Sequence, residues 1–382
     1  NLYLSYIGKS VKTNKEQESS LILKEFISFL NTNYAWQESD ITEYPLHAFS
    51  DRCYSENYHS YDDAWLKLMN EKPTVFFDKD NNEIGSAKKL PQTLMVSKLV
   101  NIFDNPLKAY TNYGLDLKLE DNFEELEDSE PFDINPLEKH SLKQSLFENI
   151  SQGNDTKKVE KLAKLSGKLP ESVLTDSQLS EQVFNMRNLV ENGDITNLDK
   201  KYFKAEVAGY ELETSCYIKD NQLALATTSS FKIKHKFELY ITALLVAYAE
   251  QKDICATYYY LEKDEPKDDF VINIEYTTVK ERLEHYIKMA ESIASQPMLV
   301  HLSLAEALYV FVKESRKKDA AMVAKNQKQQ QECWAKVISD ENNYSALDKD
   351  NYFNVFYSEH PNLDEFEGES IYIDFFESLN SK

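Results

Sequence analysis

The hydrophobic pattern of this chain changes its period near residue 202, and that change limits the folds open to it. Upstream, apolar residues recur at helical spacing. Downstream, alternation predicts strands, with a polar turn at Lys219, Asp220 and Asn221 joining the first two. The predicted order is helices over 138–150, 155–166 and 176–192, strands over 204–218 and 222–228, a helix over 236–251, and strands over 254–261 and 270–276. This order predicts an α/β fold in which a mixed sheet is flanked by helices.

Further elements are expected on both sides of this core. The N-terminal pattern predicts a strand over 2–7, a helix over 20–30, an irregular connector over 31–90, and a helix between Pro91 and Pro106. The C-terminal pattern predicts helices over 277–294, 303–330 and 345–358 and a short one over 371–379. The length of 382 residues fits two or three structural units. We divide the chain into three predicted parts, residues 1–90, 91–200 and 201–382.

Scarce glycine and abundant acid exclude several classes of protein. The chain contains 8 glycines and neither a Walker A loop nor a GxGxxG motif, so no glycine-rich phosphate loop is expected. The net charge of −22 argues against a free-standing nucleic-acid binder, because positive fields gather phosphates. No apolar run approaches the roughly 20 residues of a membrane-spanning helix. There is also no signal-peptide core, and we therefore expect a cytoplasmic protein.

The residues that commonly bind metals show no ligand spacing. The four cysteines form no CxxC pair, and thiols in a chain of this length are expected to be free: Cys53, Cys216, Cys255 and Cys333. The 7 histidines are scattered and include no HExxH motif. We therefore predict no metal site and no cofactor.

The order helix, strand, hairpin, strand and helix suggests the PD-(D/E)xK nuclease fold. Such nucleases carry an acid on the second core strand and an acid and a Lys on the third, which together hold Mg²⁺ and position the attacking water. At the corresponding positions this chain has Leu212, Ala226 and Thr228. Hydrocarbon groups and one hydroxyl cannot hold a hard cation. We therefore predict a degenerate nuclease-like core without catalytic residues.

Two other hypotheses stay open. An active nuclease could use migrated carboxylates, namely Glu211 or Glu213 on one face of a strand or Glu238 on the following helix, although no Lys stands at the required position. Alternatively, the chain could be an acidic interaction protein that never touches DNA, which the net charge favours.

Local positive charge bears on the choice between these hypotheses. The strongest basic cluster comprises Lys232, Lys234, His235 and Lys236, in a predicted loop between the third core strand and the helix. Alternating lysines along an extended loop could contact successive phosphates, so these four are the candidate DNA-contact residues. A solvated loop that only offsets the acidic charge is an equally good interpretation.

Several short segments resemble the RecC family, the gamma subunit of exodeoxyribonuclease V. They include Asn105-Pro106-Leu107-Lys108-Ala109-Tyr110 after a helix, Glu130-Pro131-Phe132 before the next helix, and Ala208-Gly209-Tyr210 in the strand region. Segment 44–50 is similar to a further family motif, with Asp51 where Pro is usual. The resemblance is spread over essentially the whole chain.

The resemblance implies an organisation and a role. Residues 1–90 are then the end of a helicase-like domain and a connector, 91–200 a helical region, and 201–382 an inactivated nuclease-like domain with C-terminal helices. RecB and RecD are the implied partner subunits, and double-stranded DNA ends and unwound single strands are the implied DNA partners. In this interpretation the fragment is non-catalytic, scaffolds the other subunits, and helps to split and guide DNA during double-strand-break repair in bacteria.

Overall fold

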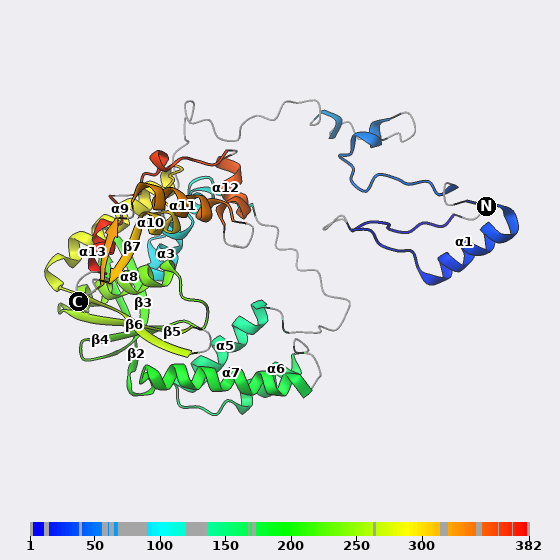
Figure 1. The fold of residues 1–382 in the computed structure, drawn as a ribbon. Helices are drawn as coiled ribbons and strands as arrows, with labels where there is room; N and C mark the ends of the chain where they lie inside the picture. The colour runs from blue at the N-terminus through cyan, green and yellow to red at the C-terminus, as the bar shows by residue number, and fades with distance from the viewer. Residues whose placement is uncertain are drawn as a thin grey trace. The chain divides into compact units, whose positions relative to one another are not determined.

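A computed structural model divides the chain into two compact units, residues 1–76 and 77–382, which are described separately (Figure 1). The structure describes residues 3–10, 15–37, 40–55, 60, 65–67, 90–119, 134, 136–166, 169, 173–262, 265–313, 320–324, 326–340, 346–357, 359–368 and 370–379. Segment Glu130-Pro131-Phe132 of the family resemblance lies outside these residues.

The first unit contains one substantial helix, α1 (Leu21–Tyr34), and a short 3-10 turn at Asp51–Tyr54. Ser20 caps α1 by accepting a hydrogen bond from the Leu23 amide, and the predicted helix over 20–30 is confirmed. The predicted strand over 2–7 is wrong in the described residues from 3 onward, because the only pairing nearby is an isolated bridge between Lys9 and Glu16. No hydrophobic side chain is buried in the described part of this unit.

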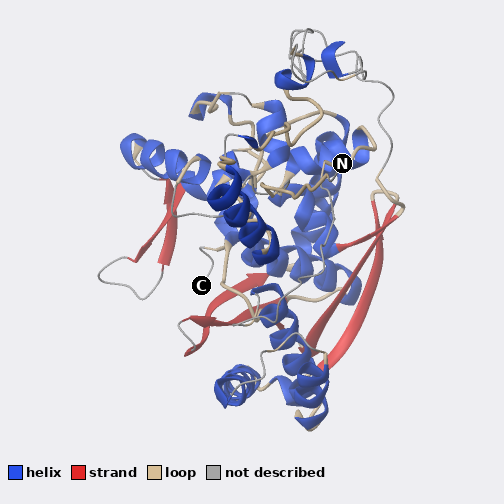
Figure 2. Cartoon of the chain, turned by 90° about the vertical axis from the view of Figure 1, so that its right-hand side faces the viewer, coloured by secondary structure: helices blue, strands red, loops and turns tan. Residues whose placement is uncertain are grey.

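The second unit is built on a curled mixed sheet (Figures 1 and 2). Its strands are β1 (Thr93–Met95), β2 (Asp199–Val207), β3 (Tyr210–Lys219), β4 (Gln222–Ala226), β5 (Ile254–Glu262) and β6 (Glu265–Ile274). Strands β2, β3 and β4 form an antiparallel meander, helix α8 (Ile233–Glu250) crosses over, and β5 returns parallel to β4. Strand β6 pairs antiparallel with β5, and β1 pairs parallel with β3. The predicted mixed α/β architecture is confirmed.

One predicted strand proved to be two. The strand expected over 204–218 folds back at Ala208 and Gly209, both with positive φ (50° and 83°), so Val207 lies opposite Tyr210. Such two-residue turns need left-handed backbone, which glycine adopts readily. The sequence carries the signal, because the core-facing positions shift from odd to even numbers across this turn. The hairpin turn predicted at Lys219, Asp220 and Asn221 is confirmed, except that Lys219 still pairs with Gln222 as the last residue of β3.

Two helical layers cover the sheet on opposite faces (Figure 1). The first layer shares the largest hydrophobic core and comprises α3 (Val96–Asp104), α4 (Pro106–Ala109), the central α8, α9 (Val279–Ser295), α10 (Leu302–Leu308) and α13 (Ile373–Ser378). The second layer comprises α5 (Pro136–Ser151), α6 (Lys157–Leu165) and α7 (Val173–Asn192). Helix α8 is apolar around most of its circumference, which is typical of a helix enclosed by other elements.

The C-terminal region departs from its predicted helices. The helix expected over 303–330 is wrong, because α10 ends at Leu308 and a hairpin follows, formed by β7 (Tyr309–Lys313) and β8 (Ala320–Ala324). The β-branched and aromatic residues of β7 favour a strand. Helix α11 (Gln327–Ile338) comes next, then a 3-10 turn at Leu347–Lys349, α12 (Asn351–Phe356) and the predicted final helix as α13. A smaller core joins α10, α11 and α12 to the π-helical turn Tyr110–Gly114.

This smaller core contains a buried histidine, and we expect it to make the protein less stable in mild acid. The His301 side chain packs edge-on against the Phe353 ring, and neither of its nitrogens has a hydrogen-bond partner among the described residues. Burial lowers the pKa of His301 to about 3. Below about pH 6.5 the unfolded chain therefore binds a proton here that the folded chain does not. The contribution to the free energy of unfolding falls by about 1.4 kcal/mol per pH unit until the pH approaches the folded pKa.

Chemical denaturation of the wild type and of His301→Leu, at intervals between about pH 7 and pH 4, tests this expectation. Carboxylates titrate in both proteins, so the comparison isolates the histidine. The wild type should lose stability more steeply with falling pH than the variant. Equal pH dependence in the two proteins contradicts the expectation.

Candidate functional site

A cluster of polar side chains lies where the first turn of α8 meets the ends of β4 and β5. Tyr258, on β5 and almost fully buried, interacts electrostatically with Glu238 of α8 and lies near Thr227, which follows β4 directly. The Thr227 hydroxyl in turn lies 2.9 Å from the Ser229 hydroxyl. Burial is the main cause that raises the pKa of Glu238, and it also raises the pKa of Tyr258 well above its ordinary value. A buried carboxyl with a raised pKa is a common feature of functional sites, and also of internal polar networks.

His235 belongs to the same cluster and helps to start α8. Its Nδ1 accepts a hydrogen bond from the Lys232 amide at 3.0 Å, which satisfies the cap of the helix. The imidazole stacks on the Phe231 ring, with centroids 6.0 Å apart. Burial, with the neighbouring Lys234 and Lys232 charges, lowers the pKa of His235 to about 4. Near neutral pH His235 is therefore uncharged, and it adds no positive charge to this basic cluster.

The prediction that the four candidate DNA-contact residues lie in a loop is wrong. Helix α8 begins at Ile233 and therefore contains three of them. Lys234 forms an ion pair with Asp104 of α3 at 3.3 Å. Lys236 binds Glu306 of α10 at 3.2 Å and lies over two aromatic rings, those of Phe231 and Phe270. Lys232 is exposed at the helix cap. Lys234 and Lys236, which were predicted to contact phosphates, therefore form ion pairs with carboxylates of the same chain.

The three positions that would carry nuclease chemistry do not converge. Leu212 on β3 is fully buried in the core formed with α8. Ala226, at the end of β4, packs instead against the core formed by α5 and α7. The two side chains therefore lie on opposite faces of the sheet, and Thr228 follows beyond the end of β4. The register of the β3–β4 hairpin, in which Lys219 lies opposite Gln222, decides this, because a shift of one residue would bring Leu212 and Ala226 to the same face.

The alternative carboxylates are also separated. Glu211 and Glu213 lie on one face of β3, as predicted, and both contact the Lys204 ammonium on β2, at 2.6 and 3.5 Å. The hydrogen bond from Lys204 lowers the pKa of Glu211. Glu238 belongs to α8, which packs on the other face of the sheet. Within the described residues, no group of three or more His, Cys, Asp or Glu side chains is arranged to hold a metal ion.

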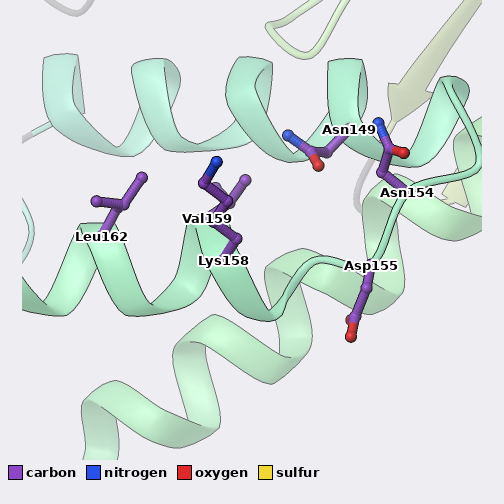
Figure 3. Close-up of a pocket in the computed structure, with 6 residues that line it drawn as sticks. All are labelled: Asn149, Asn154, Asp155, Lys158, Val159 and Leu162. Atoms are coloured by element: carbon purple, nitrogen blue, oxygen red, sulfur yellow. The ribbon is translucent and has the colours of Figure 1, made fainter.

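A groove not singled out by the sequence lies between α5 and α6 (Figure 3). Its volume is about 460 Å³, and its lining residues are Asn149, Asn154, Asp155, Lys158, Val159 and Leu162. The aliphatic and basic residues come from α6, whereas Asn149 comes from the end of α5.

The cysteines of the described residues are all free, as predicted. Nowhere in the described ranges does a helix reach the length and apolarity needed to cross a membrane.

Comparison with known proteins identifies the family. The family described as RecC C-terminal domain matches residues 91–309, which is more than half of the chain and includes the whole curled sheet. Similar proteins named RecBCD enzyme subunit RecC include the following three. The Haemophilus influenzae protein is 26% identical over 154 residues, covering 38% of this chain and 13% of the relative. The protein of Buchnera aphidicola subsp. Schizaphis graminum is 23% identical over 224 residues, covering 55% and 21%. The Escherichia coli protein is 22% identical over 208 residues, covering 50% and 18%.

The chain spans between 13% and 21% of the length of these relatives. The match agrees with the resemblance found in the sequence, in which Asn105–Tyr110 and Ala208–Tyr210 both fall within the matched region. In the structure these two segments are the capped start of α4 and the hairpin turn before β3. This chain therefore belongs to the RecC C-terminal domain family.

Proposed function

We propose that this chain acts as a non-catalytic C-terminal region of a RecC subunit, within a RecBCD-type complex that repairs DNA double-strand breaks. The proposal rests on the family match and on the printed name of the relatives. RecB and RecD are the proposed partner subunits. The proposed DNA partners are double-stranded ends and the single strands unwound from them.

The observation that carries the non-catalytic role is the arrangement of Leu212, Ala226 and Thr228. The meander, the crossover helix α8 and the parallel β5 support a nuclease-like core. A metal-dependent nuclease needs oxygen ligands that converge on one cation. Here Leu212 and Ala226 are aliphatic and lie on opposite faces of the sheet. This supports a degenerate nuclease-like domain over the proposed range 201–382.

A second part of the proposal, which rests on the family resemblance, is that residues 1–90 are the end of a helicase-like domain. Helix α1 has an apolar face but buries none of its residues, and Ile22 is 80% exposed. A short helix is only marginally stable without tertiary packing, so α1 requires another surface to cover it.

A protein scaffold without DNA contact is a second candidate function, and the α8 ion pairs favour it. Lys234 and Lys236 are engaged by Asp104 and Glu306. Each phosphate contact would have to compete with these internal carboxylates. DNA contact through Lys232, Lys234, His235 and Lys236 stays a prediction, with exposed Lys232 the best placed of the four.

Two measurements on the purified chain test the proposed function. When it is co-expressed with the RecB and RecD proteins of the same organism, we expect the three chains to elute together in size-exclusion chromatography. When it is incubated alone with Mg²⁺ and linear duplex DNA, we expect no cleavage above a buffer control. Failure to associate with either subunit contradicts the scaffold role. Mg²⁺-dependent cleavage that is lost in Glu211→Gln or Glu238→Gln contradicts the non-catalytic role and supports the migrated-site alternative.

A further inference from the structure

We propose that the exposed side of α6 that borders its groove with α5 binds an acidic, amphipathic segment of a partner protein. The surface is a stripe of four residues, Lys158, Lys161, Leu162 and Leu165, called the α6 stripe below. Their spacing of three, four and seven residues from the first places them on one side of the helix. The stripe borders the groove between α5 and α6, to which Lys158 and Leu162 contribute (Figure 3).

The leucines of the α6 stripe are unusually exposed for aliphatic residues at adjacent helical positions. Leu162 is 59% exposed and Leu165 is 72% exposed. Other apolar residues of α6, Val159 and Ala163, pack against the core shared with α5 and α7. The helix therefore already has an inner apolar face, and the stripe is a second one. Contiguous exposed apolar residues beside a groove are a feature of interaction surfaces.

The lysines of the α6 stripe are available for a partner. Neither Lys158 nor Lys161 forms an ion pair within the described part of the chain. The two other lysines near them are engaged, Lys157 with Asp155 at 3.8 Å and Lys164 with Asp176 at 2.5 Å. In a chain of net charge −22, this stripe therefore presents local positive charge next to aliphatic surface. A partner with carboxylates around an apolar ridge is complementary to both features.

An acidic peptide fits this surface better than a nucleic acid does. Single-stranded nucleic acids are held by a basic groove together with aromatic side chains on which bases stack, and α6 supplies lysines but no aromatic residue. Amphipathic helices instead insert aliphatic residues into grooves between helices. One lining residue, Asp155, is itself acidic, but it pairs with Lys157, and Figure 3 shows its carboxylate pointing away from the gap between the helices.

The inference stands apart from the proposed function, since its test needs neither DNA nor the RecB and RecD subunits. The probe is a fluorescein-labelled 15-residue helical peptide with Leu at positions i, i+4 and i+7 and Glu elsewhere on the same side. Binding to the full chain is followed by fluorescence anisotropy. A second peptide replaces each Glu by Lys, and a third replaces each Leu by Gln. A labelled single-stranded oligonucleotide represents the nucleic-acid alternative.

Two double variants remove equal charge from the same helix. The first double variant, Lys158→Gln with Lys161→Gln, removes the two lysines of the α6 stripe. The matched control, Lys157→Gln with Lys164→Gln, removes two lysines that already form ion pairs with Asp155 and Asp176. Exposed ion pairs each contribute modestly, so we expect the first variant to weaken binding of the acidic peptide about fivefold and the control by less than twofold. Leu162→Ser with Leu165→Ser, which leaves the charge unchanged, should weaken it about tenfold or more.

Binding of the acidic amphipathic peptide, with neither control peptide binding comparably, supports the proposal. It is overturned if that peptide does not bind, or if the two lysine variants weaken binding equally. Stronger binding of the oligonucleotide than of the peptide, lost in Lys158→Gln with Lys161→Gln, also overturns it in favour of nucleic acid. Because all the altered side chains are exposed, unchanged circular dichroism and melting temperatures are expected and show that each variant has folded.

Discussion

Replacing Leu212 with Asp is expected to destabilise the protein by more than about 4 kcal/mol and to create no nuclease activity. The substitution removes a buried Leu side chain, which typically costs 2–5 kcal/mol. It also places a carboxyl among apolar groups, where an unpartnered polar group costs a further 1–3 kcal/mol or so. Leu212 is fully buried, opposite Leu94 on β1 and Ala205 on β2. Urea denaturation and a cleavage assay with Mg²⁺ measure the two outcomes.

Two further variants make this result specific. Leu212→Met keeps the volume and the apolar character, so it should cost less than about 1.5 kcal/mol. Ala226→Asp introduces the same carboxyl at a half-buried position on the other face of the sheet and should cost less than Leu212→Asp. A stable Leu212→Asp protein that binds Mg²⁺ would show that the position faces an open metal site. That result would contradict the packing described here.

Replacing Phe237 with Ala is expected to lower the free energy of unfolding by about 3–5 kcal/mol, the range for large-to-small changes at buried aromatic positions. Phe237 lies on α8 and is fully buried. Its ring meets Phe103 and Tyr286 edge-on, each at 5.3 Å between centroids, and Phe375 at 5.1 Å. These three partners belong to α3, α9 and α13, so one cavity would loosen four helices at once. Chemical denaturation measures the loss.

Phe184→Ala is the matched control, because Phe184 on α7 is 62% exposed. It should change stability by less than about 0.5 kcal/mol, as surface substitutions usually do. If the two variants lose similar stability, α8 is not the centre of the fold. If the urea midpoint of Phe237→Ala falls without a change of slope, the second unit unfolds as one cooperative body.

The helices that could be predicted are those with a strong local signal. Helices α5, α6, α7 and α8 each show apolar residues at helical spacing, and all four were predicted within a few residues. The strand β1 was missed, because three residues carry too little pattern and its pairing partner lies far along the chain on β3. The helix predicted over 303–330 failed for a related reason. The pairing of β7 with β8 is a contact between segments, which helical spacing does not report.

The hairpin at Ala208 and Gly209 leaves a mark in the alternation of apolar residues. Core-facing residues are odd-numbered in β2 and even-numbered in β3. A regular strand keeps the same alternation throughout, so the shift marks a turn or a bulge, and the positive φ angles at Ala208 and Gly209 make it a turn. The relative placement of Leu212 and Ala226 depends instead on the second hairpin, in which Lys219 lies opposite Gln222.

The sequence by itself determined the chemical character of the chain. It established the α/β order, the absence of acids and Lys at the assigned nuclease positions, and the likeness to RecC, since all three depend on residue identity and local spacing. Only the tertiary structure decided which groups meet. It placed Leu212 and Ala226 on opposite faces of the sheet, and it paired Lys234 with Asp104 and Lys236 with Glu306. These outcomes depend on strand register and helix packing between distant segments, and no local pattern of residues contains that information.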